Sequence, residues 1–151
     1  MIRQRFNEAL KDAMRAKDEI ALATVRLILA ALKDRDIAAR STGNTEGIPD
    51  DDVLNMLQTM VKQRRESISL YEQGGRLDLA EQEAAEIAVI QRFLPKQMDE
   101  GEIKVAVDGV IKELNASSLK DMGRTMAALR DRYAGQMDFG KASGIVKTQL
   151  A

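Results

Sequence analysis

Apolar residues recur at steps of three and four along most of the chain, which is the spacing of one face of an α-helix. In the first segment the repeat runs through Ile2, Phe6, Leu10, Ala13 and Met14. Strands draw on β-branched and aromatic residues, yet the 151 residues include only three Phe, two Tyr and no Trp. The pattern therefore predicts an all-α protein.

Capping residues, glycines and a proline divide this pattern into seven expected helices. In chain order these boundary signals are Asp18, Asp50-Asp51-Asp52, Gly74-Gly75, Asp78, Pro95, the Asp99 and Glu102 pair, the Ser118 and Asp121 pair, Gly135 and Asp138. The segment from Ser41 to Pro49 lacks periodicity and predicts a loop. The stretch from Ile20 to Leu32 is apolar almost all round, so we expect a central helix that the others surround.

The Leu94-Pro95 pair predicts a boundary between two domains. Proline cannot donate a backbone hydrogen bond, and it pushes the residue before it out of helical geometry. Beyond it the apolar pattern restarts with shorter helices. We therefore predict a four-helix N-terminal domain over residues 1–94, followed by a compact three-helix tail domain over residues 95–151.

Two residue types are absent, and their absence excludes several kinds of chemistry. The chain has no Cys and no His, so disulfides, Cys-ligated zinc, thiol nucleophiles and imidazole acid–base catalysis are ruled out. The acidic clusters at 50–52 and at Glu81, Glu83 and Glu86 do not match the spacing of a calcium loop. We expect no metal and no cofactor.

The N-terminal segment and the apolar stretch in the second helix bear on location. Glu8 and Asp12 interrupt the N-terminus before the apolar core of a signal peptide can form. The stretch from Ile20 to Leu32 is too short to span a bilayer and carries Arg26 in its middle. We expect no membrane contact and a cytoplasmic location.

Charge is distributed unevenly along the chain, although the formal net charge is only −1. Residues 1–94 hold 14 basic and 16 acidic side chains, whereas residues 117–151 hold 6 basic and 3 acidic. A polyanion is therefore expected to meet the C-terminal end.

Two short motifs come close to known catalytic or nucleotide-binding signatures. Residues Gly135 to Ala142 nearly match the sequence of a phosphate-binding P-loop, but Ala142 lacks the hydroxyl that binds magnesium. A P-loop also follows a buried strand, whereas the segment before Gly135 is expected to be a helix. Ser117 and Lys120 imitate the Ser-x-x-Lys pair of serine β-lactamases, whose companion motifs are missing. In both segments the end of one helix and the start of the next explain the residues better.

The densest basic run holds Lys62, Arg64 and Arg65 in the middle of the third helix. Because Lys62 and Glu66 are four residues apart, a solvated helix face laced with ion pairs is favoured over a dedicated anion site. The three cations remain a secondary candidate patch. Few aromatic residues are present to stack bases, so any RNA contact should be made through phosphates and shape.

Five segments together resemble the YqeY family, the free-standing relatives of the C-terminal tail of GatB, a subunit of glutamine-dependent tRNA amidotransferase. The segments are Val25 to Lys33, Lys62 to Ser67, Gly75 to Leu79, Leu94 to Gln97 and Ala116 to Gly123. The resemblance covers essentially the whole chain. It implies a helical N-terminal domain joined to the compact tail that amidotransferases use against the body of their tRNA.

The resemblance also implies a family-level association with carbon–nitrogen ligases that take the amide nitrogen of glutamine. The catalytic cradle of GatB lies outside the shared tail, and the amidase subunit with its Ser-Ser-Lys arrangement is not matched. We therefore expect no catalytic residue in this chain alone. An enzyme that works with carboxylates and lysines is the weakest hypothesis, because nothing in the spacing points to a convergent site.

The leading hypothesis is a non-catalytic module that binds tRNA, or an assembly that modifies or aminoacylates tRNA. The local positive excess and the position of the tail resemblance select Lys120, Arg124, Lys141 and Lys147 as the expected phosphate contacts. The alternative is a helical protein–protein interaction adaptor that never contacts RNA.

Overall fold

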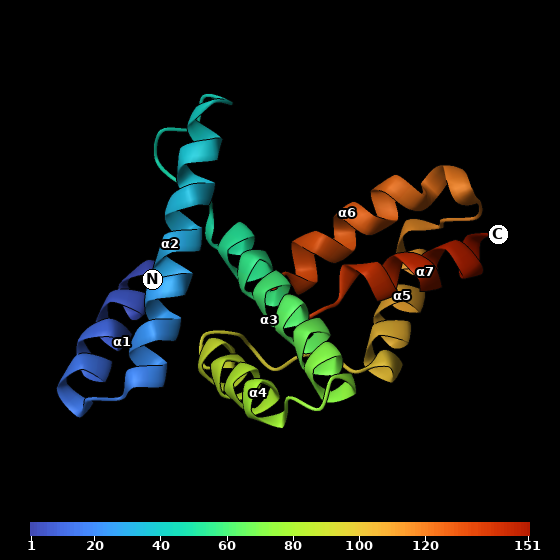
Figure 1. Cartoon of the computed structure of the whole chain (residues 1–151). Coiled ribbons are helices and arrows are strands. Elements are labelled where there is room, and N and C mark those ends of the chain that lie inside the picture. Colours follow the sequence, from blue (N-terminus) through green and yellow to red (C-terminus); the bar gives the residue numbers. More distant parts are fainter. The chain divides into compact units, whose positions relative to one another are not determined.

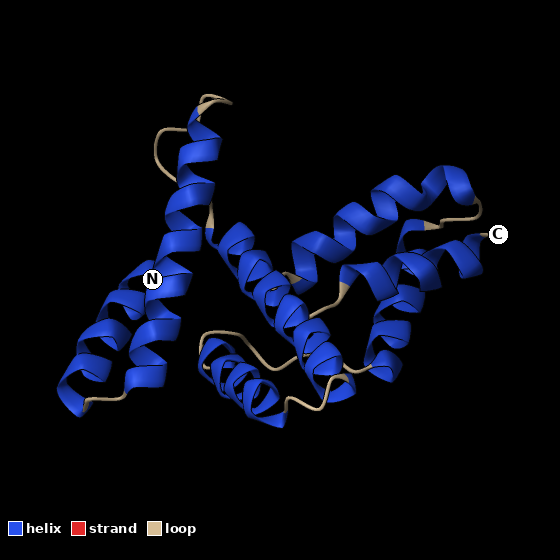
Figure 2. Cartoon of the chain, in the orientation of Figure 1, coloured by secondary structure: helices blue, strands red, loops and turns tan.

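A computed structural model describes all residues from 1 to 151, and every regular element in it is a helix (Figures 1 and 2). The elements are α1 (Ile2–Ala16), α2 (Glu19–Arg40), α3 (Asp50–Gln73), α4 (Leu77–Gln91), α5 (Glu100–Leu114), the short 3-10 helix η1 (Leu119–Asp121), α6 (Met122–Tyr133) and α7 (Phe139–Leu150). The prediction of an all-α protein is confirmed.

Local capping chemistry sets the helix starts close to the positions expected from sequence. A carboxylate oxygen of Asp18 accepts a hydrogen bond from the backbone N–H of Ala21 at 3.0 Å at the start of α2. Asp99 and Glu102 form the predicted capping box, in which Asp99 accepts from the Glu102 N–H at 2.8 Å. The sixth start differs, because Ser118 precedes the 3-10 turn η1 and α6 begins only at Met122.

The chain divides into two compact units, Met1–Leu94 and Pro95–Ala151, called here the N-terminal unit and the tail unit. In the N-terminal unit α1 packs on α2 and α3 packs on α4, while α2 also contacts α3 and α4. The core includes Phe6 on α1 and Phe93 just after α4, whose rings meet edge to face with centroids 4.9 Å apart. This contact ties the first helix to the end of the fourth.

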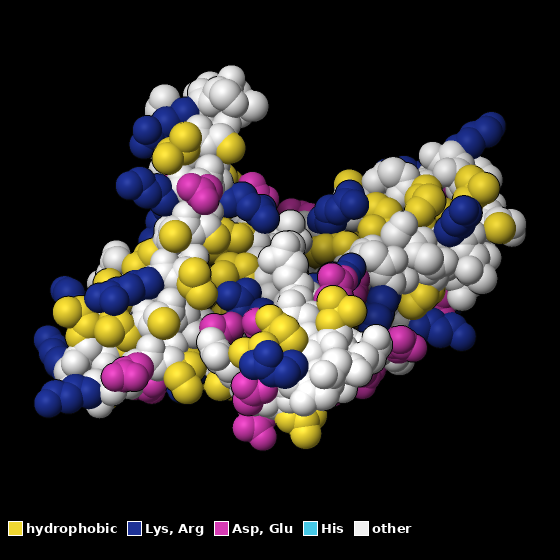
Figure 3. All heavy atoms as spheres, viewed as in Figure 1, with side chains coloured by type: hydrophobic (Ala, Val, Ile, Leu, Met, Phe, Trp, Pro, Cys, Tyr) yellow, Lys and Arg dark blue, Asp and Glu magenta, His cyan; other side chains and the backbone are white.

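The expectation that α2 is surrounded by the other helices is wrong. One side of α2 is buried, but Ile20, Leu27 and Ile37 on the other side are 48%, 46% and 48% exposed. Three neighbouring helices cover only one side of α2, which leaves an apolar strip uncovered. Figure 3 shows apolar side chains along α2, with lysine and arginine side chains beside them.

A bidentate ion pair holds the loop between α2 and α3. The guanidinium of Arg3 donates to both carboxylate oxygens of Asp36, at 2.8 and 2.9 Å, and also donates to the carbonyl of Ile48 at 3.0 Å. Asp36 in turn accepts from the Ile48 N–H at 2.9 Å. The Arg3 hydrogen bond, helped by that backbone N–H, lowers the pKa of Asp36 to about 2.

We predict that Asp36→Asn destabilises the N-terminal unit by about 1 kcal/mol at pH 7, because it weakens the Arg3 contacts and removes a charge partner. The folded pKa of Asp36 lies below its ordinary value of 3.8, so its stabilisation is complete above that value and is lost as pH falls towards 2. Urea unfolding at pH 7 and at about pH 2 measures this. A difference between the two proteins that does not shrink in acid would contradict the assigned ion pair.

The tail unit has its own apolar core, made where α5, α6 and α7 pack against one another. Its fully buried side chains include Val107 of α5, Leu129 of α6 and Val146 of α7. Met137 is also fully buried, although it lies between α6 and α7 in a segment without apolar periodicity. The connection between these helices is therefore part of the core.

Candidate nucleic-acid interface

The four cations expected to contact phosphate are all exposed on the tail unit, on three different elements. Lys120 belongs to η1 and Arg124 to the first turn of α6, whereas Lys141 lies in the first turn of α7 and Lys147 in its last turn. Each position follows from the capping chemistry: Asp121 ends η1 and precedes α6, and Asp138 starts α7.

Two of these cations are free of ion pairs and two are engaged. Lys120 and Lys147 have no acidic partner within ion-pair distance. The Nε of Arg124 lies 3.1 Å from a carboxylate oxygen of Asp121, and the Nζ of Lys141 lies 3.6 Å from a carboxylate oxygen of Glu100. Both pairs are at the surface, where an ion pair contributes little and is readily exchanged for another anion.

The structure does not bring the four cations to a single point. Lys141 and Lys147 are six residues apart on α7, so they are offset by about 9 Å along the helix and point to different sides of it. In the tail unit α7 contacts η1, the turn that carries Lys120, while Lys141 and Lys147 lie near opposite ends of α7. The arrangement fits phosphates spread along a backbone rather than one bound phosphate.

A groove between α5 and α7 adds a lysine that the sequence did not single out. It measures about 400 Å³ and is lined by Glu100, Lys104, Lys141, Gly144, Ile145, Thr148 and Gln149. Gly144 leaves open space there, because a Cβ added to it would meet no atom within 4 Å. The only signal in the sequence was a glycine inside an apolar helical pattern, which does not reveal which lysine lies opposite.

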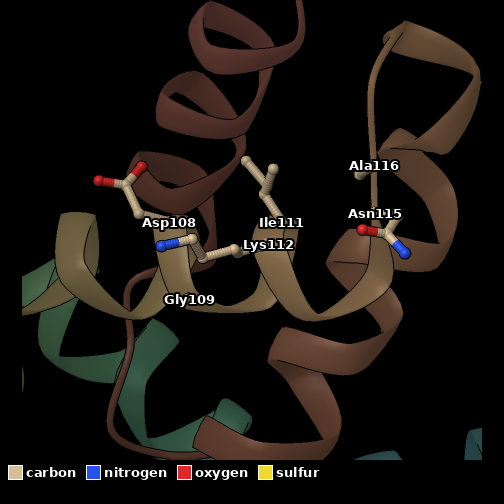
Figure 4. Close-up of a pocket in the computed structure, with 6 residues that line it drawn as sticks. All are labelled: Asp108, Gly109, Ile111, Lys112, Asn115 and Ala116. Carbon is tan, nitrogen blue, oxygen red and sulfur yellow. The ribbon is translucent and has the colours of Figure 1, made fainter.

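A second, shallower hollow of about 560 Å³ lies along the later half of α5 (Figure 4). Asp108, Gly109, Ile111, Lys112, Asn115 and Ala116 line it. Asn115 takes the left-handed conformation that ends α5, with φ of 52°. Lys112 and Asp108 both border the hollow, so its charge is mixed and favours no anion.

Neither of the short motifs forms the site that it imitates. At the start of α7 the carboxylate of Asp138 accepts hydrogen bonds from the N–H groups of Gly140 and Lys141, at 2.9 and 3.2 Å, in the place where a P-loop holds phosphate. The segment before it is the helix α6. In the other motif, Asp121 accepts from the N–H of Ser117 at 2.9 Å, so Ser117 takes part in a helix start.

The secondary patch on α3 is split by the environment of Arg64. Its side chain is only 14% exposed, and its Nε lies 3.2 Å from a carboxylate oxygen of Glu86 and 4.0 Å from one of Glu83 on α4. Lys62 and Arg65 are exposed, but the expected pair of Lys62 with Glu66 is absent. That prediction is wrong, because two solvated side chains gain little from pairing.

We predict that Arg64→Ala destabilises the N-terminal unit by about 2 kcal/mol at pH 7, because it leaves two half-buried carboxylates facing each other. Burial and the neighbouring Glu86 already raise the pKa of Glu83, so protonation should relieve much of this loss near pH 4. The exposed pair Lys62→Ala and Arg65→Ala is the matched control, and its thermal unfolding should not change. An equal loss of stability in Arg64→Ala and in the control would show that Arg64 has no structural role of its own.

No group of three or more carboxylate side chains is placed to hold a metal ion. No helix combines the length and apolar character needed to cross a membrane.

Comparison with known proteins places the chain in a family. The family model described as Yqey-like protein matches residues 3–150. The chain is similar to two proteins named "Altered inheritance of mitochondria protein 41, mitochondrial". The one from Lachancea thermotolerans is 29% identical over 93% of this chain and 74% of the relative, and the one from Clavispora lusitaniae is 30% identical over 93% and 80%.

The names of those relatives place them in mitochondria, so the cytoplasmic location of this chain stays a prediction. The family match extends over both compact units and over all five segments that carry the resemblance. The chain therefore belongs to the Yqey-like protein family.

Proposed function

We propose that this protein is a non-catalytic, cytoplasmic module that binds tRNA, or an assembly acting on tRNA, through its tail. The observation that carries the proposal is the exposure of Lys120 and Lys147 without ion pairs, in a segment, residues 117–151, that holds 6 basic and 3 acidic side chains. The tail of GatB, which the family resembles, is the part of the amidotransferase that faces tRNA. The same resemblance links the protein to carbon–nitrogen ligation with glutamine as the amide donor.

The proposed contacts are with phosphate rather than with bases. Tyr133 and Phe139 are partly buried in the core of the tail unit, so they do not offer an open stacking platform. Arg124 and Lys141 are held only by surface ion pairs, which a phosphate can replace at little cost. Lys104 borders the same groove as Lys141 and extends the cationic surface.

We further propose that the two compact units are the two predicted domains, four-helical over residues 1–94 and three-helical over residues 95–151. Each unit has a separate cluster of buried apolar side chains, which is what an independently folding domain requires. Under this proposal the tail can bind RNA without the N-terminal unit.

The contacts of Glu83, a carboxyl whose pKa is raised, support the non-catalytic part of the proposal. Burial raises the pKa of Glu83, but Glu83 lies beside Arg64 and Glu86 in a contact between two helices. The guanidinium of Arg64 pairs with both Glu83 and Glu86 and holds them in this contact. Such a group stabilises packing rather than performing acid–base chemistry.

The alternative, a protein–protein adaptor, is favoured by one specific observation, the uncovered apolar strip on α2. The strip belongs to the N-terminal unit and the proposed phosphate contacts belong to the tail, so the two hypotheses differ in whether the tail binds RNA.

Salt dependence and charge reversal of the full-length protein test the tRNA proposal. With about four phosphate contacts, the affinity for tRNA should fall roughly a hundredfold between about 50 and 200 mM salt. Lys120→Glu combined with Lys141→Glu should weaken binding about tenfold or more and flatten the salt dependence. The matched control is Lys11→Glu with Arg35→Glu, two exposed cations of the N-terminal unit; it changes the charge equally and should leave the tRNA affinity unchanged. Unchanged affinity in the first variant would remove these residues from the interface.

A further inference from the structure

The uncovered side of α2 has the spacing of a coiled-coil seam. Ile20, Ala23, Leu27, Ala30, Asp34 and Ile37 follow one another at alternating steps of three and four residues. These are the a and d positions of successive heptads, with Ile20 at the first a position. All six are exposed, so the seam has no partner within the N-terminal unit.

The seam lies on a helix that is already held in place. On the opposite side of α2, Val25, Ile28 and Leu32 are buried in the core of the N-terminal unit. A helix docking on the seam would therefore meet a preformed surface, and α2 would lose little conformational entropy on binding.

A row of cations borders the seam. Arg26, Lys33 and Arg40 occupy the g position of each heptad, which places them about 10.5 Å apart along one edge. All three are exposed, and none forms an ion pair. Residues at the g position pair with the flanking residues of a partner helix and decide which partner is accepted. Three like charges at this position select a partner with acidic flanks.

The same charges disfavour a second copy of this chain. In an antiparallel pair of α2 helices the g positions face each other, so Arg26, Lys33 and Arg40 would meet cations. In a parallel pair the a positions face each other, and Asp34 would meet Asp34 in the middle of the seam. Both arrangements oppose like charges, so the partner is a different helix.

We propose that this face of α2 binds an amphipathic helix of another protein, with an apolar heptad seam, acidic residues at the flanking positions and a cationic or amide side chain facing Asp34. A polar residue at a single a position fixes the register of such a pair. The seam covers fewer than three full heptads, so the complex is a transient one of about micromolar affinity. This inference does not depend on the binding of tRNA by the tail.

Two synthetic helical peptides of about 21 residues test the proposal against the full-length protein. Both carry a leucine seam with one lysine to face Asp34; one has glutamates at the flanking positions and the other has lysines. Fluorescence anisotropy should show saturable binding of the acidic peptide, at least about tenfold tighter than that of the basic peptide, and weaker binding as salt rises.

Charge exchange makes the test specific. The variant with Arg26→Glu, Lys33→Glu and Arg40→Glu should reverse the preference and bind the basic peptide. Leu27→Glu should abolish binding of both, and since Leu27 is exposed, its circular dichroism and thermal unfolding should match the parent protein. The matched control with Lys96→Glu, Lys104→Glu and Lys112→Glu changes as many exposed charges in the tail, and it should keep the preference for the acidic peptide.

Several results would overturn the proposal. These are equal affinity for the two peptides, no saturable binding of the acidic peptide below about 1 mM, and a preference that survives the triple charge reversal. Binding to phosphatidylserine vesicles that Leu27→Glu abolishes, with no binding of the acidic peptide, would instead assign the face to a lipid surface.

Discussion

Replacing Phe6 by alanine is expected to lower the free energy of unfolding of the N-terminal unit by about 3–5 kcal/mol and to leave the tail unit unchanged. Phe6 is completely buried, and its ring packs edge to face against Phe93. Truncation removes this contact and leaves a cavity that the surrounding helices can fill only in part. Arg5, whose guanidinium lies over the Phe93 ring at 5.5 Å, also loses part of its support.

The matching truncation in the tail, Leu129→Ala, should cost about 2–5 kcal/mol and leave the N-terminal unit unchanged, because Leu129 is fully buried in the separate core of the tail. The chain offers a natural probe for each unit, since its two tyrosines are Tyr71 on α3 and Tyr133 on α6. In a protein that carries Tyr133→Phe, the fluorescence of Tyr71 reports the urea unfolding of the N-terminal unit. In one that carries Tyr71→Phe, the fluorescence of Tyr133 reports the unfolding of the tail unit.

Exposed leucines provide the controls for both truncations. Leu70 in the N-terminal unit is 67% exposed and Leu119 in the tail is 50% exposed, so alanine at either position should shift unfolding by less than about 0.5 kcal/mol. If Phe6→Ala lowers the free energy of unfolding equally, whether it is measured at Tyr71 or at Tyr133, the chain unfolds as one cooperative unit and the proposed pair of domains is wrong.

Helix boundaries could be predicted because their causes lie within a few residues. Asp18, the Asp99 and Glu102 pair and Asp138 satisfy the free N–H groups of their own helices. Two starts differ: α4 begins at Leu77, one residue before the expected Asp78, and α6 begins late. The cause of the second difference is local as well, because Asp121 accepts from two successive N–H groups and pairs with Arg124. These competing bonds favour a short 3-10 turn before the α-helix begins.

Contacts between helices could not be predicted, because apolar spacing does not say which helices become neighbours. The ion pair of Arg3 with Asp36 joins residues 33 apart in sequence. Arg64 reaches Glu86 on the next helix, and so a residue that sequence places in a basic patch is largely neutralised. The pairing depends on how α3 and α4 turn towards each other, which only the packed structure shows.

The apolar stretch of α2 shows a different limit of sequence reasoning. A helix that is apolar almost all round is usually buried on all sides, yet half of this one faces outward. Much of the outward arc is alanine, which adds apolar character without the bulk that demands burial. The outward side of α2 also carries the heptad spacing of the proposed seam. The sequence therefore shows this spacing, but it does not show that this side of the helix faces solvent.

The tail cations show what the structure adds to a count of charges. Sequence singles out Lys120, Arg124, Lys141 and Lys147 by the local positive excess and by the position of the tail resemblance. The structure leaves Lys120 and Lys147 free and engages Arg124 and Lys141 in surface ion pairs. It also adds Lys104 beside Lys141 in the groove between α5 and α7. Helix packing and ion pairs therefore decide which of these cations are available to the proposed RNA contact.

The central claim is that the tail binds tRNA and that the N-terminal unit does not. Residues 95–151 made as a separate protein should keep the affinity of the full chain within about threefold, since they hold all the proposed phosphate contacts. Residues 1–94, in which acidic side chains outnumber basic ones by 16 to 14, should bind at least about a hundredfold more weakly. Circular dichroism must first show that both fragments are helical and unfold cooperatively.

The deciding measurement is therefore the affinity of each fragment for the same labelled tRNA, at one salt concentration, beside the full-length protein. Binding by residues 95–151 that disappears with Lys120→Glu and Lys141→Glu, and no binding by residues 1–94, is the predicted result. Binding by residues 1–94 with none by the folded tail would contradict the assignment.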